Sequence, residues 1–407
     1  MKNKILFAFL YLVAFIAVGQ AIIYFEQMPT LDVIYSNCRL ALFPIVLFVF
    51  FIKKIKWNGL FTLLAIYLFV ILFSSIEHGT NALIPLISLT ITTISFIASI
   101  SIGAKVDFEK AIKMGRNVFN VYILLNFLLI LKYPEGIWFD ASQANSPDEV
   151  GRYFIGGNYN QMGAALICAV ISNAVYYYLT KQDKLILIIS ILVSLSSLAI
   201  VGSKTSLIGI ALFTIFLMLS PKRKQSSFIL YGFLAFYVFF QIQTVFLLTD
   251  LSHNGFVNYF IEDVLQKDTS FSSRTNIWFR SAPVFLASPI DGWGFQDIEW
   301  YEDNINGVSP HNYIYSVLLK GGLILLGVLI LIISFLVLKE RKGRSVYTAV
   351  ALAGLFVILF MMIMEVYNII YIVYVMYLSY LISYHGLETK LIKNKFQMRK
   401  MSYQLSS

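Results

Sequence analysis

Charged residues are scarce in this chain. They make up 13% of its 407 residues, whereas hydrophobic residues make up 58%. A soluble domain of this size would need far more charge on its surface, so the composition excludes a soluble globular protein and indicates a polytopic membrane protein. Cysteine is nearly absent as well. Cys38 and Cys168 provide no disulfide framework, and we interpret Cys168 as a small packing residue.

The sequence also lacks a cleavable signal peptide, a fixed-period repeat and inverted repeats. The apolar run after Lys2 and Lys4 is too long for a signal peptide, and no small-x-small cleavage site follows it, so we expect a retained first span. The chain shows no repeat of fixed period. It also shows no inverted halves with matching broken helices, which weakens a transporter interpretation.

Apolar runs long enough to cross about 30 Å of hydrocarbon dominate the chain. We predict a single all-α polytopic membrane domain over residues 1–407, with about twelve transmembrane helices and one long extracytoplasmic loop. The predicted spans are residues 4–25, 38–52, 57–76, 82–102, 117–132, 160–180, 184–201, 205–220, 226–248, 312–338, 346–364 and 367–385.

The positive residues indicate how the chain is oriented. If alternate connectors are cytoplasmic, starting with the N-terminus, 23 of the 31 Lys and Arg residues fall on that side. We therefore expect both termini in the cytoplasm, including the basic tail 386–407, and the polar segment 249–311 outside. The net charge of +9 is then mainly an orientation signal. The cations that it leaves unexplained gather near the outer face: Arg39, Lys132, Arg152, Lys204, Lys267, Arg274, Arg280 and Lys320.

The loop 249–311 is too long for a mere connector, and such loops usually carry function. Ser272-Ser273 predicts the N-cap of a helix from Arg274 to about Ala287. On a straight helix Arg274 and Arg280 point about 120° apart, so they meet one ligand only if long side chains or a kink at Pro283 bring them round. Alternatively, the helix lies on the outer leaflet and both arginines are interfacial.

Two ionisable residues lie where this loop re-enters the membrane. A lone loop histidine is usually incidental, and we keep that interpretation for His253. His311 is a stronger candidate because it lies at the level of the outer headgroups. Lys320 lies about 12 Å further along the tenth span at 1.5 Å per residue. An ionisable residue there is a functional hypothesis, although pairing with Glu365 or snorkelling explains it equally well.

A shorter outer segment, residues 133–160, ends in Gly156-Gly157, which breaks regular structure before the sixth span. Asn158 and Asn160 can then offer amide groups at the outer mouth of that span, or simply cap its helix. Arg152 is either an interfacial anchor or an anion ligand. We expect the site where the long loop closes over spans six, eight and ten.

These elements resemble, in their order along the chain, the signature of the O-antigen ligase and polymerase superfamily of bacterial surface-polysaccharide enzymes. The resemblance covers about residues 150–330. Its elements are Asn158-x-Asn160, similar to an Asn-Pro-Asn element; Gly202-Ser203-Lys204-Thr205-Ser206, similar to Gly-Ser-Arg-Thr-Ala; and Arg274…Trp278…Pro289-x-x-Gly292-x-Gly294-Phe…His311-Asn312-x-x-Tyr315…Gly321-Gly322-Leu323.

The resemblance implies a GT-C-like membrane glycosyltransferase that uses undecaprenyl-diphosphate-linked sugars and needs no metal or other cofactor. His311 would be the base that deprotonates the acceptor hydroxyl. The residues that would bind the diphosphate or the substrate are Arg152, Lys204, Arg274, Arg280, Asn158, Asn160, Asn312 and Lys320. Two positions depart from the family pattern. Lys204 replaces an arginine fork with a point charge, and Lys320 stands where an acid is common.

The leading functional prediction is a polysaccharide polymerase of the bacterial cytoplasmic membrane, working in capsule, exopolysaccharide or O-antigen assembly. Its partners would be an undecaprenyl-diphosphate-linked oligosaccharide, membrane lipids, and a chain-length regulator and flippase of the same pathway, but no nucleic acid. The alternatives are a ligase that moves finished glycan to lipid or protein, a flippase or other transporter, and a non-enzymatic assembly or sensor protein.

The predicted orientation can be tested with single cysteines. In a background with Cys38 and Cys168 changed to serine, a membrane-impermeant thiol reagent added outside should label Trp300→Cys and leave Lys342→Cys unlabelled. The reverse pattern would place the long loop in the cytoplasm and contradict the orientation of every candidate residue in it.

Overall fold

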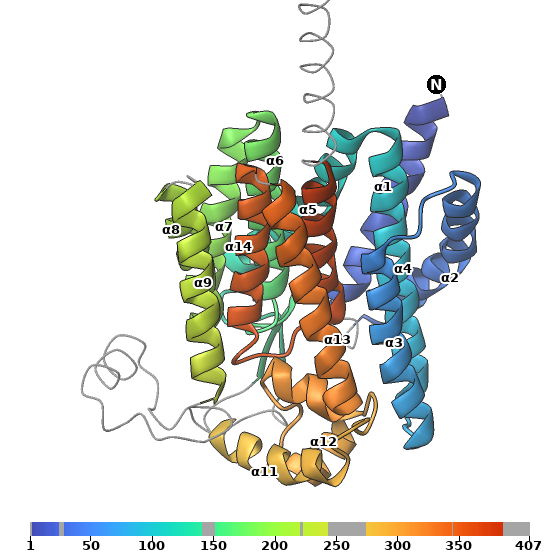
Figure 1. The fold of residues 1–407 in the computed structure, drawn as a ribbon, viewed down its shortest axis with the longest axis vertical. Helices are drawn as coiled ribbons and strands as arrows, with labels where there is room; N and C mark the ends of the chain where they lie inside the picture. Colours follow the sequence, from blue (N-terminus) through green and yellow to red (C-terminus); the bar gives the residue numbers. More distant parts are fainter. Residues whose placement is uncertain are drawn as a thin grey trace, which may run out of the picture.

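The computed structural model describes residues 2–23, 28–140, 151–219, 223–242, 274–343 and 345–385. Within these residues the chain forms a bundle of long helices with a small sheet among them (Figure 1). The elements are α1 (Lys2–Ile22), α2 (Pro29–Ile52), α3 (Gly59–Glu77), α4 (Leu83–Val106), α5 (Phe108–Lys132), β1 (Trp138–Asp140), β2 (Gly151–Phe154), β3 (Gly157–Asn158), α6 (Gly163–Thr180), α7 (Lys184–Val201), α8 (Lys204–Met218), α9 (Arg223–Phe240), α11 (Arg274–Ala287), α12 (Ile298–Ile305), α13 (Tyr313–Gly343) and α14 (Val346–Met361), followed by a helix over Ile369–His385.

The bundle has the lengths and composition of a polytopic membrane protein. In the described part of the chain, eight helices are long and apolar enough to cross a membrane: α1 to α7 and α13. α8, α14 and Ile369–His385 are apolar but shorter. Large side chains such as Phe48 and Phe51 stay exposed on the outside of the bundle, as expected for contact with lipid. Each of the twelve predicted runs overlaps a helix, while the exact number of spans stays a prediction.

The second predicted span began too late in the sequence. α2 starts at Pro29, not at residue 38, because the polar residues before Cys38 do not end the helix. Arg39 is buried inside it, and its Nη1 donates to the hydroxyls of Ser88 at 2.5 Å and Thr92 at 3.3 Å on α4. A neighbouring helix therefore satisfies a charge that hydropathy alone places at the membrane edge.

The fold is all-α as predicted, but the shorter outer segment also contains a small sheet that the sequence did not indicate. β1, β2 and β3 form an antiparallel sheet in which Trp138 is opposite Tyr153 and Phe154 is opposite Gly157. The turn between β2 and β3 is tight, and Gly157 adopts φ 85°, which a residue with a side chain rarely does. The predicted break at Gly156-Gly157 is thus the turn of a hairpin.

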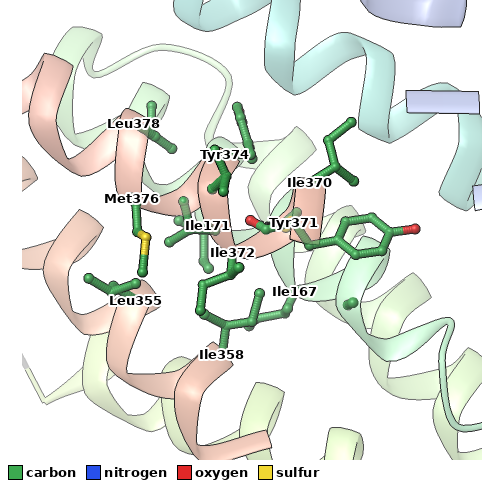
Figure 2. Close-up of a cluster of buried hydrophobic side chains, with 14 of the residues drawn as sticks. Ile167, Ile171, Leu355, Ile358, Ile370, Tyr371, Ile372, Tyr374, Met376 and Leu378 are labelled. Carbon is green, nitrogen blue, oxygen red and sulfur yellow. Dashed lines mark hydrogen bonds between the residues drawn. The ribbon is translucent and has the colours of Figure 1, made fainter. Parts of the chain in front are cut away.

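α6 is the most enclosed of the eight candidate spans and packs against α5, α7 and α14. Figure 2 shows Ile167 and Ile171 of α6 against Leu355 and Ile358 of α14, with side chains of Ile369–His385 completing the cluster. All four isoleucine and leucine side chains are fully buried. This close packing fixes the two short C-terminal helices against the centre of the bundle.

The two ends of the bundle differ. Figure 1 shows the N-terminus and the end of the last described helix at one end, while α11 and α12 lie across the other. Among the described residues, the start of α1 and the end of the last helix therefore lie at one end of the bundle, and the helices of the long loop lie at the other. Which of the two sides faces the cytoplasm is still a prediction from the charges.

α13 is broken inside the tenth predicted span. Gly321 and Gly322 leave the helical conformation, which frees peptide groups on both sides of them. A turn of the long loop takes up these groups through three backbone hydrogen bonds: Leu323 N to Pro289 O at 2.9 Å, Ile324 N to Ile290 O at 3.1 Å, and Trp293 N to Leu319 O at 2.6 Å. The loop is therefore bound to the bundle by main chain as well as by side chains.

Glycine is required at this contact. Gly322 adopts φ 60°, and a Cβ there would lie 2.2 Å from the carbonyl oxygen of Ile290. On the loop side, a Cβ at Gly292 would lie 2.6 Å from the nitrogen of Gly321. Two backbones can approach this closely only where neither carries a side chain.

Gly322→Ala should therefore lower stability by about 2 kcal/mol or more, through strain and loss of the docked turn. Gly327→Ala is the matched control, because it lies on the same helix with open space around its Cβ, and alanine favours helix by about 1 kcal/mol. Thermal unfolding of the purified proteins in detergent should give a midpoint several degrees lower for Gly322→Ala and unchanged or higher for Gly327→Ala. Equal midpoints would contradict the proposed close contact.

Candidate active site

The helix predicted to start at Arg274 is α11, and it ends at Ala287 as expected. Ile277, Trp278 and Ser281 form its buried side, while Arg280 is exposed. The two arginines therefore point in different directions, as the helical spacing indicated. The predicted N-cap at Ser272-Ser273 lies outside the described residues, as do His253 and Lys267.

Trp278 connects α11 to the candidate histidine. Its side chain is fully buried, and its Nε1 donates to the carbonyl oxygen of Pro310 at 3.0 Å. A buried indole N–H needs an acceptor, and here the acceptor belongs to the residue just before His311. α11 therefore fixes the turn that carries His311.

The Gly-Trp-Gly turn between α11 and α12 docks on the end of α3. Phe295 N donates to Ser75 Oγ at 2.8 Å, and Thr80 Oγ1 donates to Phe295 O at 2.5 Å. A Cβ at Gly294 would lie 2.4 Å from the Cα of Ser75. The family-like Gly292-x-Gly294 element is thus a docking element and contributes no reactive group itself.

His78 and Asp291 add an ion pair to this contact, with His78 Nε2 3.5 Å from Asp291 Oδ2. The Ser288 hydroxyl donates to Asp291 at 2.7 Å and holds the pKa of that carboxyl below its usual value. Glu77 completes a group whose ligand atoms lie within 4.8 Å of one another, and it is the one such possible metal-ligating group among the described residues. No diphosphate-binding candidate belongs to this group.

His311 itself has an unusual backbone. It adopts φ 45°, in the left-handed region, and its N–H donates to Ser309 Oγ at 3.3 Å. Its side chain is 25% exposed, and its Nδ1 lies 3.5 Å from Glu365 Oε2. Backbone of this kind is concentrated at functional sites, where the surrounding structure holds it in place.

Asn312 is the structural clamp of this turn. Its side chain is fully buried, and all of its amide groups are engaged. It exchanges two hydrogen bonds with Gln241, at 3.0 and 3.2 Å, donates to Ile363 O at 2.9 Å and accepts from Tyr315 N at 3.0 Å. A direct substrate contact by Asn312 would require one of these buried bonds to break.

Glu365 is the residue of this site that sequence reasoning missed. It lies between α14 and the last helix, and its side chain is 8% exposed. One carboxylate oxygen accepts a hydrogen bond from Arg274 Nη2, and the other faces His311. Pairing of Glu365 with Lys320, one of the explanations left open for Lys320, is therefore not what the structure shows. A lone carboxylate between two strongly apolar runs was a usable signal, because such residues are rarely incidental.

Arg152 lies on β2, beside the junction of α7 and α8. Its Nη2 donates to Val201 O at 3.2 Å, its Nη1 lies 3.6 Å from Glu135 Oε2, and its guanidinium lies over the ring of Tyr159 at 5.5 Å. Gly202 ends α7 in the left-handed conformation, and Lys204 begins α8 directly after it. The sequence-predicted cations Arg152 and Lys204 thus share one corner of the bundle.

Ser206 connects this corner to Glu365. Its hydroxyl lies 3.1 Å from that of Tyr367, two residues after Glu365, and Tyr367 is close enough to interact electrostatically with Glu365 and Arg274. The structure therefore places the beginning of α8 beside the Arg274–Glu365–His311 cluster. The segments that directly precede α6, α8 and α13 therefore lie near one another, and the segment after α14 lies beside them.

Asn158 and Asn160 do not cap α6. The N-cap residue is Met162, and Asn158 accepts a hydrogen bond from Asn160 N at 3.0 Å in a local turn after β3. Capping was the simpler of the two explanations for these residues, and it was wrong because the hairpin, not the helix, begins the structure there. Both side chains stay partly exposed.

Lys320 and Arg280 stand apart from this cluster. Lys320 Nζ lies 5.1 Å from the ring centre of Phe295, in a cation–π contact. The predicted depth of about 12 Å rests on a continuous helix up to Lys320, and α13 is helical from Tyr313 to Lys320, with its break at Gly321 directly afterwards. Arg280 is exposed and makes no ion pair with the described residues.

A comparison with known protein families found a match. Residues 184–330 match the model of the O-antigen ligase family. They form an O-antigen ligase domain. This domain contains Lys204, Arg274, Arg280, His311, Asn312 and Lys320, whereas Arg152, Asn158, Asn160 and Glu365 lie outside the match. A search of curated proteins found no match to the chain.

The matched family has a known general role. It comprises membrane glycosyltransferase-like ligases and polymerases of surface-polysaccharide assembly, which act on lipid-linked glycans. The matched residues include the docked turn, α11, His311 and Lys204. Glu365 reaches the same cluster from beyond the end of the match.

The role of Trp278 in holding the His311 turn can be tested by Trp278→Phe. The change removes the donor to a buried carbonyl, which costs about 1–3 kcal/mol, and should lower the thermal unfolding midpoint by several degrees. Trp300→Phe is the matched control, since the Trp300 side chain donates no hydrogen bond to the described residues. Equal losses in the two variants would show that the hydrogen bond to Pro310 is not what Trp278 contributes.

Proposed function

We propose that this protein is a polysaccharide polymerase of the bacterial cytoplasmic membrane. It transfers a growing glycan from its undecaprenyl-diphosphate carrier to a lipid-linked repeat unit on the outer face, in capsule, exopolysaccharide or O-antigen assembly. The observation that carries the proposal is the cluster of Arg274, Glu365 and His311. Arg274 and His311 lie within the O-antigen ligase domain and Glu365 lies beyond it, and in this proposal the cluster supplies both a base and an anion-binding group.

The reaction requires one proton transfer and one displacement. His311 faces Glu365 through Nδ1, so Nε2 is the nitrogen left to accept the proton of the acceptor hydroxyl. The hydroxyl oxygen forms a bond to the anomeric carbon of the donor sugar. The bond from that carbon to the diphosphate oxygen breaks, and undecaprenyl diphosphate leaves with the electron pair.

The leaving diphosphate needs positive charge close to it. The side chain of Arg274 is 16% exposed, and Glu365 contacts both Arg274 and His311. The guanidinium of Arg274 can form paired hydrogen bonds to phosphate oxygens. Arg152 and Lys204, at the neighbouring corner, are placed to extend this binding region along the glycan or the diphosphate. In this proposal Arg274, Arg152 and Lys204 neutralise the negative charge of the leaving diphosphate, and no metal takes part.

A ligase is the main alternative, because it breaks the same bond and differs in the acceptor. The polymerase adds to a second lipid-linked repeat unit, whereas a ligase transfers finished glycan to lipid or protein. A flippase would carry the lipid-linked unit across the membrane without bond formation. The product of a purified system distinguishes these three functions.

The test uses purified protein in liposomes with lipid-linked glycan extracted from a host strain that lacks this gene. Wild-type protein should convert this glycan into a ladder of longer lipid-linked chains, with or without a chelator. His311→Ala and Arg274→Ala should each lower the rate at least a hundredfold, since each removes a group that acts on the reacting atoms. His385→Ala, at the opposite end of the bundle and stacked on Phe108, is the control and should keep the ladder.

Three outcomes would count against the proposal. A normal ladder in both His311→Ala and Arg274→Ala would show that the cluster is not catalytic. Transfer of glycan to an added lipid or protein acceptor, without any ladder, would identify a ligase. Loss of the ladder when a chelator is present would contradict the metal-free reaction and point to the group of Glu77, His78 and Asp291.

A further inference from the structure

Glu365 lies between the two groups that the proposed reaction uses. Its side chain is almost completely buried, and its two oxygens face in different directions. One oxygen accepts a hydrogen bond from Arg274, and the other faces His311. A single carboxylate thus contacts both the anion-binding candidate and the candidate base.

The two contacts are unequal. The contact with Arg274 is a close hydrogen-bonded ion pair. The contact with His311 is 3.5 Å long, and the Nδ1 atom of His311 is buried without a hydrogen-bond partner. A buried polar nitrogen left in this way is unfavourable. Glu365 is therefore hydrogen-bonded to Arg274, and its other oxygen lies slightly too far from His311 to form a hydrogen bond.

A bound diphosphate would weaken the contact of Glu365 with Arg274 and favour its contact with His311. It would carry negative charge to Arg274, where it competes with the carboxylate for the same guanidinium donors. It would also repel the Glu365 carboxylate, because like charges this close disfavour each other. A carboxylate displaced from Arg274 already has the unsatisfied Nδ1 of His311 3.5 Å away.

We propose that Glu365 is a positioning residue that moves its hydrogen bond from Arg274 to His311 when the donor diphosphate binds. This inference rests on the proposed function. In the resting state Glu365 neutralises Arg274 and leaves His311 loosely held. In the donor-bound state Arg274 holds the diphosphate, and Glu365 fixes the proton on Nδ1 so that Nε2 points its lone pair at the acceptor hydroxyl. Deprotonation of the acceptor is thereby tied to the presence of a donor.

Chemical balance is simple in this scheme. The acceptor proton moves to Nε2, and the carboxylate stabilises the imidazolium that results. Glu365 neither gains nor loses a proton. After undecaprenyl diphosphate leaves, His311 returns the proton to water and Glu365 pairs with Arg274 again.

The scheme makes an unusual prediction for Glu365→Gln, which keeps the shape of the side chain and removes its charge. Arg274 loses its competitor, so the affinity for a diphosphate should rise about tenfold. His311 loses its partner, so the polymerisation rate at saturating substrate should fall about a hundredfold. The two effects have opposite signs. A merely structural ion pair would give lower affinity and lower rate together.

Affinity is measured with farnesyl diphosphate, a short polyprenyl diphosphate, by calorimetric titration of the purified protein in detergent. Rate is measured by the ladder assay. Glu365→Asp is the second variant, because its shorter side chain weakens both contacts and keeps the charge. It should move affinity and rate in the same directions by smaller factors, and it decides the matter if Glu365→Gln does not fold.

The outcomes separate this inference from the proposed function. If the wild type forms the ladder and Arg274→Ala binds the probe at least tenfold more weakly, the proposed function stands. Unchanged or weaker probe binding in both Glu365 variants then overturns the role given to Glu365. If the wild type neither binds the probe nor forms the ladder, the proposed function itself fails.

Discussion

The main-chain contact between the loop turn and the break in α13 is the constraint on which the rest of the candidate site depends. A helix interrupted inside a membrane exposes peptide groups that hydrocarbon cannot satisfy. Here the turn around Gly292 satisfies them, and the absence of side chains at Gly292 and Gly322 lets the two backbones meet. The turn joins α11 to α12, so fixing it also fixes α11, and through Trp278 it fixes the turn of His311.

The candidate site is therefore assembled from segments that lie far apart in the sequence. α11 brings Arg274, the entrance to α13 brings His311, and the segment after α14 brings Glu365. The beginning of α8 joins them through Ser206 and Tyr367. A cluster assembled in this way depends on the packing of the whole C-terminal half.

Much of the fold could be predicted because apolar runs and charge bias report directly on the membrane. The class, the helices, α11 and the junction at Gly202 all follow from local sequence. The hairpin at Gly156-Gly157 was missed because three short strands give little periodic signal. The start of α2 was missed because hydroxyl groups of α4 satisfy the charge of Arg39, and the sequence around Arg39 does not reveal that contact. Family-like motifs located Arg274 and His311, but the partner of both could not be predicted, because nothing in a sequence says which buried carboxylate will reach which cation.

The paired amides of Gln241 and Asn312 have a consequence for the long loop. They join its two ends by reciprocal hydrogen bonds at the edge of the bundle, so the loop is closed at its base. Gln241 directly follows α9 and Asn312 directly precedes α13, so the clamp fixes these two helix ends relative to each other. His311 is the residue before Asn312, and the same two hydrogen bonds therefore also determine where its backbone lies.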